Sequence, residues 1–247
     1  FVGSCFADNI GKRFEEEKFR AVVSPFGVMY NPVSVLHTAR KMAGTPFDTA
    51  VFTLGTNHVY VERATGEIVD NCQKRPQREF EERELTIDEC ADALREAISL
   101  LRTSNPRLRV IVTVSPIRYA KYGYHESQLS KAVLLLAADK LTKEASGEVY
   151  YFPAYEIVND ELRDYRFYKA DMLHPNEQAV AYIWEQLVAT CFSATAKQFL
   201  KEWRPIKEAL AHRPFHPEAA TYQDFLKKTK EAARLLKQKY PNLELKE

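Results

Sequence analysis

Apolar residues along the chain follow two alternating patterns, short unbroken runs and longer stretches with helical spacing. The short runs, which predict strands, cover residues 22–24, 51–55, 110–114 and 149–153. Residues 110–114 read Val-Ile-Val-Thr-Val without polar alternation, which is typical of a strand buried on both faces. Helical spacing between these runs predicts a parallel sheet flanked by helices, the α/β class.

Start signals mark several of the helices. Asn31-Pro32 can cap and begin one helix, and Thr86 with Glu89 has capping-box spacing for the next. A third helix is expected from about Ser127, and a fourth after Pro175. The inward side of the third helix is expected to carry Leu129, Ala132, Val133, Leu136 and Ala137, and that of the fourth Val180, Ile183, Trp184 and Leu187.

Two further segments complete the expected organisation. Val59–Arg63 and Glu67–Val69, joined through a Gly-containing turn, predict a β-hairpin inserted at about residues 58–70. After Cys191 the pattern is helical only, with breaks expected at Pro205 and at residues 213–217 and a last helix over about 222–239. We therefore expect a domain over residues 1–192 and a helical extension over residues 193–247.

Composition narrows the class of protein. The chain has 247 residues, 45% hydrophobic and 28% charged, as is ordinary for a globular enzyme. Its net charge of +1 gives no support for nucleic-acid binding, and no apolar run is long enough for a membrane span. The sequence does not indicate an oligomeric state. Because it opens at Phe1 without a methionine, we expect the native N-terminus, with any signal peptide, to lie upstream.

The four cysteines, Cys5, Cys72, Cys90 and Cys191, are scattered without metal-ligand spacing, so no metal site is expected. Cys90 stands at an apolar position of a predicted helix, where a buried inert thiol is expected. Nothing in the pattern requires disulfides, which favours a reducing compartment such as the cytoplasm.

Ser4 is the first candidate for chemistry. Gly3-Ser4 stands between an apolar residue and a helical pattern containing Phe6 and Ile10, as in a strand-to-helix turn. In open α/β sheets ligands bind at such carboxyl ends of strands, and helix N-terminal N–H groups favour an oxyanion there. A serine that only caps the helix is the alternative reading.

Asp171 and His174 are the second candidate. A serine hydroxyl becomes a nucleophile when a neutral imidazole takes its proton, and a carboxylate fixes the tautomer of that imidazole. Asp171-Met172-Leu173-His174-Pro175 supplies both groups from one loop before a predicted helix. Asp171 as a turn cap and His174 as a surface residue are the alternative.

Asn57 is the third candidate. In Gly55-Thr56-Asn57 it follows a buried-type strand, so its amide could donate to an oxyanion together with the Ser4 backbone N–H. By itself the segment is a turn signal. Ser4, then Gly-x-Asn, then Asp-x-x-His is a particular chain order, and all three fall at ends of predicted strands or before the last helix of the domain.

This order resembles the SGNH (GDSL-like) hydrolase superfamily, and within it the chain is similar to the GSCFA family, named for the pentapeptide at Gly3–Ala7. Further blocks share the resemblance, which extends from Phe1 to about Phe192: residues 24–32, 53–56, 113–116, 151–158 and 164–175. The helical tail also resembles the extension of some members.

The resemblance implies a three-layer α/β/α sandwich with a flavodoxin-like, five-stranded parallel sheet. It assigns Ser4 as nucleophile, His174 as general base and Asp171 as its orienting carboxylate. It implies an oxyanion hole from the Ser4 N–H, Asn57 and a glycine of the second block, for which Gly27 is the candidate, with Asn31 or a neighbouring amide as alternatives. No cofactor is implied.

The implied reaction is hydrolysis of a small acyl ester, acetyl by analogy, on a carbohydrate or similar small molecule through an acyl-serine. The alternative is a binding or interaction module that acts through its pocket or its C-terminal helices. One departure is the short link at residues 43–48, where family members usually have a longer stretch.

Other polar residues are expected to have lesser roles. The Cys5 thiol is expected to pack rather than to attack, and His58 and His125 are expected to be polar loop residues. His212 and His216 have i, i+4 spacing, but Pro214 between them interrupts a helix, so a metal pair is not expected.

Overall fold

The structure, a computed structural model, describes residues 1–145 and 147–242. The chain forms two compact units. The first contains residues 1–11 and 22–183, and the second contains residues 12–21 and 184 onward. Both α1 (Cys5–Glu16) and α6 (Glu177–Cys191) run from the first unit into the second.

A parallel sheet forms the centre of the first unit. Among the described residues it has four strands in the order β1 (Val2–Gly3), β2 (Thr49–Leu54), β6 (Arg109–Val114) and β7 (Val149–Tyr151). The β2 and β6 strands pair over six positions, from Thr49 opposite Arg109 to Leu54 opposite Val114. After their exposed first residues, all their residues are buried except Ile111, which is partly buried, in agreement with the unbroken apolar runs.

The fifth strand of the expected flavodoxin-like sheet is not present among the described residues. Residues 22–24 run beside the start of the chain, where the Ser24 N–H donates to the Phe1 carbonyl at 2.9 Å. The segment then turns at Pro25, which has no N–H to donate, and at Gly27, whose φ is +85°. Contact with β1 resumes only where the Met29 N–H donates to the Gly3 carbonyl at 2.8 Å. The Phe1 amino group also donates to the Val22 carbonyl at 2.7 Å, so residues 22–24 bond to the chain start at Phe1 before the segment turns away, and no fifth strand forms in the described part of the chain.

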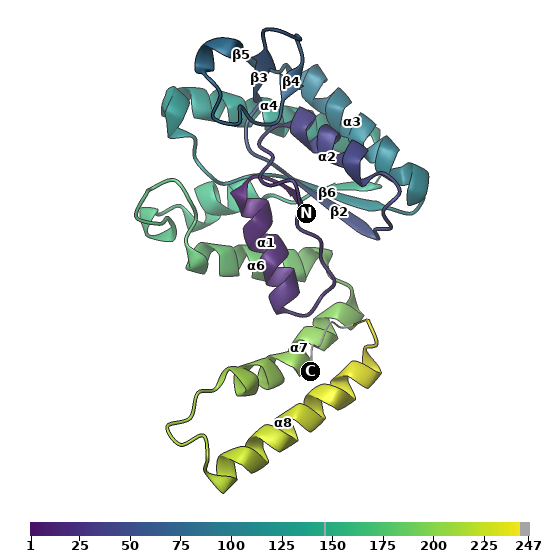
Figure 1. The fold of residues 1–247 in the computed structure, drawn as a ribbon, viewed down its shortest axis with the longest axis vertical. Helices are drawn as coiled ribbons and strands as arrows, with labels where there is room; N and C mark the ends of the chain where they lie inside the picture. The colour runs from purple at the N-terminus through teal and green to yellow at the C-terminus, as the bar shows by residue number, and fades with distance from the viewer. Residues whose placement is uncertain (146, 243–247) are drawn as a thin grey trace. The chain divides into compact units, whose positions relative to one another are not determined.

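Helices cover both faces of the sheet (Figure 1). On one face lie α2 (Pro32–Met42), α3 (Ile87–Ser104) and α4 (Gly123–Glu144), and on the other the starts of α1 and α6. The predicted start signals are confirmed: Asn31 Oδ1 accepts the Ser34 N–H at 2.9 Å, and Thr86 with Glu89 forms both bonds of a capping box. The expected α/β class is therefore confirmed, with four strands in place of five.

The inward face predicted for α4 is wrong in part. Leu129 and Leu136 are about half exposed, at 47% and 52%, although both were expected inside. The buried side instead carries Leu134, Ala137, Ala138 and Leu141 together with polar Ser127, Ser130 and Lys131. Apolar periodicity could not find this face because its first turns are polar.

A small antiparallel sheet follows β2. It consists of β4 (Ile68–Val69), β3 (His58–Glu62) and β5 (Phe80–Glu84), in that order. Tyr60 lies opposite Val69 on one side and Glu82 on the other. The sequence pattern indicated the pair at residues 58–70 but not β5, whose residues 81–84 are all charged.

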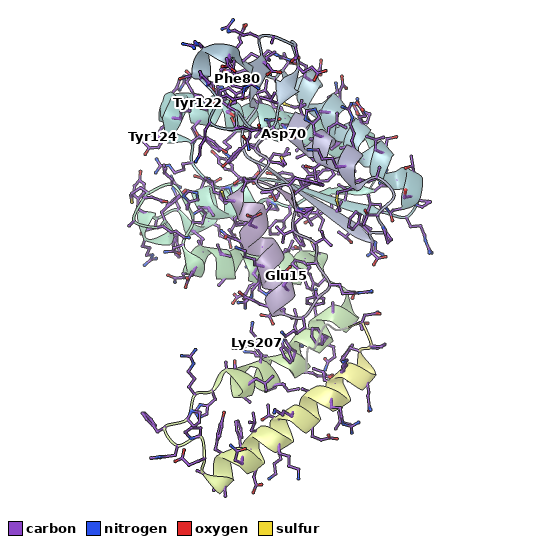
Figure 2. All side chains as sticks on the ribbon, viewed as in Figure 1. Glu15, Asp70, Phe80, Tyr122, Tyr124 and Lys207 are labelled. Atoms are coloured by element: carbon purple, nitrogen blue, oxygen red, sulfur yellow. The ribbon has the colours of Figure 1, made fainter. Side chains whose placement is uncertain are left out.

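The second unit contains α7 (Ala194–Ala211) and α8 (Ala220–Lys239). The buried side chains of Phe199, Trp203 and Leu236 form a small hydrophobic core between these two helices. The break expected at Pro205 does not occur. The exposed proline lies inside α7, where it removes one intrahelical N–H donor. Lys207 of α7, labelled in Figure 2, donates to the buried Glu17 carboxylate at 2.7 Å.

Short turns of helix complete the chain: α5 (Ala154–Glu156), the π-turn Ile157–Leu162, and the 3₁₀ turns Gln77–Glu79, Ala120–Tyr122 and Tyr165–Phe167. Within the described residues, none of the helices combines the length and the apolar character that crossing a bilayer requires.

Candidate active site

Ser4 lies between β1 and α1, and its side chain is 1% exposed. Gly3 before it has φ +147°, and a Cβ at that position would lie 2.1 Å from the Thr53 carbonyl oxygen, so only glycine fits beside β2. The Ser4 backbone N–H donates to the same carbonyl at 3.0 Å. The Ser4 hydroxyl oxygen also accepts the Phe6 N–H at 3.3 Å, a capping contact at the start of α1.

Three adjacent strands end at the level of Ser4. Strand pairing places Gly55 after β2 and Ser115 after β6, and the Ser115 N–H donates to the Leu54 carbonyl at 2.8 Å. The Ser4 hydroxyl donates to Ser115 Oγ at 2.8 Å. A Cβ on Gly55 would lie 2.9 Å from the Tyr30 carbonyl oxygen and 3.5 Å from Ser4 Cβ, so a side chain there would crowd the backbone of Tyr30.

Asp171 and His174 form a close pair. His174 Nδ1 lies 2.7 Å from Asp171 Oδ2, while Asp171 Oδ1 accepts the backbone N–H groups of Leu173 at 2.8 Å and His174 at 3.0 Å. These backbone bonds, followed by the ring contact, lower the pKa of Asp171 to about 2. An ionised Asp171 favours the tautomer with the proton on Nδ1, which leaves His174 Nε2 as a proton acceptor.

One short segment connects Ser4 with the loop that carries this pair. Ser115 contacts the Ser4 hydroxyl, and three residues later the Arg118 N–H donates to the Leu173 carbonyl at 3.1 Å. Arg118 Nη1 donates to the Met172 carbonyl at 3.0 Å. Residues 115–118 span at most about 10 Å between their outer Cα atoms. Ser4 and the His174 loop are therefore both held by the same four residues.

Aromatic rings surround the Arg118 guanidinium. Its Cζ atom lies 4.1 Å from the ring centre of Tyr124, 5.7 Å from that of Tyr165 and 5.6 Å from that of Tyr168. Tyr124, labelled in Figure 2 with Tyr122, stands at the start of α4. These cation–π contacts fix the arginine and, through it, the loop of Asp171.

In this structure the predicted triad residues are not joined in one hydrogen-bond chain. Among the described residues, the hydroxyl of Ser4 has Ser115 Oγ and the Phe6 N–H as hydrogen-bond partners, and His174 bonds through Nδ1 to Asp171.

The three residues expected at the oxyanion hole have other contacts. The Ser4 N–H donates to Thr53, and Asn57 Nδ2 donates to the Leu85 carbonyl at 2.9 Å. Asn57 is fully buried, and its Oδ1 has no hydrogen-bond partner in the described part of the chain. Oδ1 is an acceptor, so it cannot donate to an oxyanion. Gly27 lies exposed in the loop before Met29, with open space where a Cβ would be.

Besides Ser115, sequence reasoning missed two residues that lie at Gly55. Lys131 of α4 is 2% exposed, and its ammonium donates to the Gly55 carbonyl at 2.6 Å and the Ser115 carbonyl at 2.8 Å. The Tyr119 hydroxyl is buried without a hydrogen-bond partner in the described chain, and it lies 3.2 Å from the Cβ position of Gly55. Burial raises the pKa of Tyr119, so its hydroxyl stays a donor.

The remaining candidates lie elsewhere. His58 is buried, with its ring stacked on Tyr122 at 3.9 Å, and so is not the polar loop residue expected; His125 is exposed in α4. Burial raises the pKa of the Cys90 thiol to about 12, as expected for an inert buried cysteine. Within residues 1–145 and 147–242, no group of three or more His, Cys, Asp and Glu side chains is arranged to hold a metal ion.

A buried serine and an Asp–His pair, both at the carboxyl edge of a parallel sheet, are the defining features of the first unit. Residues 1–50 and 38–187 match the GSCFA family, so the chain belongs to this family. Residues 203–247 match the domain described as GSCFA domain protein, C-terminal domain. Among curated protein sequences, none matches this chain significantly.

Two solved structures are similar to the chain. One is a carbohydrate esterase family 3 protein from Talaromyces cellulolyticus, with 16% identity, a TM-score of 0.42 and coverage of 71% of this chain and 70% of that one. The other is a serine-to-alanine mutant of an acetyl esterase with an acetate ion, with 16% identity, a TM-score of 0.41 and the same coverage.

Proposed function

We propose that this protein is a serine esterase of the SGNH type, which removes a small acyl group from an ester through an acyl-serine intermediate. The observation that carries the proposal is the Ser115–Arg118 segment, which holds Ser4 at one end and the Asp171–His174 loop at the other. A nucleophile and its base must come within hydrogen-bond reach, and this shared support keeps them at one edge of the sheet.

In the proposed reaction, the Ser4 hydroxyl redirects its proton from Ser115 Oγ toward His174, while Ser4 Oγ stays beside Ser115 and attacks the ester carbonyl. His174 Nε2 accepts the hydroxyl proton as the Ser4 Oγ–carbon bond forms, and the ionised Asp171 stabilises the imidazolium. The imidazolium then protonates the departing alcohol. Water activated by the same imidazole hydrolyses the acyl-serine and frees the acid.

The oxyanion needs donors close to Ser4. Among the described residues, the Cys5 N–H at the first position of α1 has no acceptor, and the Tyr119 hydroxyl is likewise without a partner. We assign these two donors to the oxyanion, because an N–H at a helix N-terminus and a buried, unpartnered hydroxyl can each donate a hydrogen bond that stabilises negative charge. Ser4 and Asn57 would join them only by releasing their present acceptors, and Gly27 only by movement of its loop.

The proposed substrate is an acetyl or similarly small ester of a carbohydrate or comparable small molecule. This choice follows the family resemblance rather than a pocket, so a model acetyl ester is the appropriate first substrate. Neither the reaction nor the groups proposed for it requires a cofactor.

An active-site probe tests the proposal. A fluorophosphonate should label the native protein at one position, and Ser4→Ala should remove both this labelling and the hydrolysis of p-nitrophenyl acetate. Ser193→Ala, which removes the cap of α7 in the second unit, is the matched control and should keep both. Equal labelling of native protein and Ser4→Ala would refute the assignment of Ser4. A native protein without labelling or turnover would favour a binding or interaction module.

A further inference from the structure

Lys131 is a buried cation without an acidic partner. In the described part of the chain, no carboxylate lies within ion-pair distance of its ammonium; its two hydrogen-bond acceptors are the carbonyls of Gly55 and Ser115. Burial lowers the pKa of Lys131 to about 7. An apolar side chain of similar volume would fill this position without the desolvation cost, so packing alone does not account for a lysine.

The two acceptors of Lys131 belong to the residues that follow β2 and β6, the two strands next in order to β1, which leads to Ser4. Gly55 directly follows β2 and Ser115 directly follows β6, and Lys131 bonds both residues, so it joins the ends of these two strands. Ser115 Oγ accepts both the Ser4 hydroxyl at 2.8 Å and the Ile117 N–H at 3.3 Å. The position of the Ser4 partner is thus set by a backbone that Lys131 holds.

The two hydrogen bonds of Lys131 do not depend on its charge. The ammonium has three N–H donors and the neutral amine has two, and two carbonyls are to be satisfied. Near neutral pH both forms are present, and each can bond both strand ends. Lys131 can therefore position Ser115 throughout the neutral range.

We propose that Lys131 and Ser115 are positioning residues for Ser4: Lys131 fixes the ends of β2 and β6, and Ser115 then donates a hydrogen bond to Ser4 Oγ during attack. The inference rests on the proposed esterase function. In the resting protein Ser115 accepts from Ser4. When the Ser4 proton moves to His174 and Oγ bonds to the acyl carbon, the Ser115 hydroxyl rotates and donates to Oγ. Ser115 keeps its own proton throughout, so no further group gains or loses one.

The test is a double-mutant cycle with Ser115→Ala, Lys131→Met and the combined variant, with Lys140→Met as control. Lys140 lies on the same helix, is exposed and pairs with Asp88. Steady-state kinetics with p-nitrophenyl acetate and the rate of fluorophosphonate inactivation are measured. Each single variant should lower kcat and the inactivation rate roughly 10- to 100-fold, the effect of losing one hydrogen bond that strengthens in the transition state, with KM within about twofold.

The combined variant should be about as slow as the slower single variant, because both changes act through one contact. Effects that multiply, or a Ser115→Ala or Lys131→Met kcat within about twofold of native, would overturn the inference. If Lys131→Met does not fold, Lys131→Gln, which retains two N–H donors, replaces it; failure of both to fold would make Lys131 a folding residue only. Native protein without turnover or labelling would remove the esterase proposal as well, whereas active native protein with unaffected variants removes this inference alone.

Discussion

Lys131 should make the stability of the first unit depend on pH. Its pKa is about 7 in the folded protein against 10.5 for an ordinary lysine, so between these values the unfolded chain binds more protons than the folded one. Stability therefore rises with pH across this window, and the full penalty is present below about pH 7. This lowering of the Lys131 pKa corresponds to about 5 kcal/mol, of which about 3 kcal/mol is relieved between pH 7 and pH 10.

The measurement is urea unfolding of native protein and Lys131→Met at pH 7 and pH 10. Other groups titrate in this range, so the relevant quantity is the difference between the two proteins at each pH. The free energy of unfolding of native protein minus that of Lys131→Met should increase by about 3 kcal/mol from pH 7 to pH 10. Lys140→Met should track native protein, because Lys140 is exposed and its pKa is raised by Asp88. A native-minus-Lys131→Met difference constant within about 0.5 kcal/mol would refute the reasoning.

Four other changes test the fold and the site. Gly3→Ala should destabilise the protein by at least about 2 kcal/mol in urea unfolding, because its Cβ would meet the Thr53 carbonyl oxygen. Gly27→Ala, which has open space around its Cβ, should cost about 1 kcal/mol. Equal costs would contradict the contact assigned to Gly3. Asp171→Asn should lower kcat on the acetyl ester roughly 10³-fold with an unchanged thermal midpoint, because the neutral amide no longer fixes the imidazole tautomer; a change below tenfold would exclude the orienting role. Arg118→Met should lower kcat roughly tenfold by loosening the Asp171 loop, and a rise in KM alone would instead indicate a substrate contact. Tyr119→Phe should lower kcat roughly 10- to 100-fold if its unpartnered hydroxyl meets the oxyanion, and unchanged kinetics would return that role to backbone donors.

The elements with strong local signals were predictable from sequence. Val110–Val114 is a strand because its unbroken apolar run suits only a position buried on both faces, and the capping box of Thr86 and Glu89 fixed the start of α3. The pair Asp171 and His174 was also predictable, because both side chains come from one loop and their contact is local. Contacts between residues that are close in sequence depend little on the tertiary structure, so they can be predicted from the sequence.

Where the local signal conflicted with the tertiary structure, the prediction was wrong. Residues 22–24 have strand-forming composition and bond to Phe1, but Pro25 and the turn at Gly27 end this contact before it forms a ladder with β1. Pro205 was expected to end a helix, yet α7 continues through it on its exposed side. Leu129 and Leu136 were placed inside because they are apolar, and both are about half exposed.

The sequence by itself determined that Ser4 stands at a strand-to-helix turn and that Asp171 and His174 share a loop, since glycine geometry and residue spacing act over a few positions. Only the tertiary structure decided that Ser115 and Lys131 lie at Ser4, because their contacts join residues separated by 111 and 76 positions through strand pairing and the packing of α4. A buried lysine on a polar helix face carries no periodic signal, so its role became visible only when the ends of β2 and β6 were brought together around it.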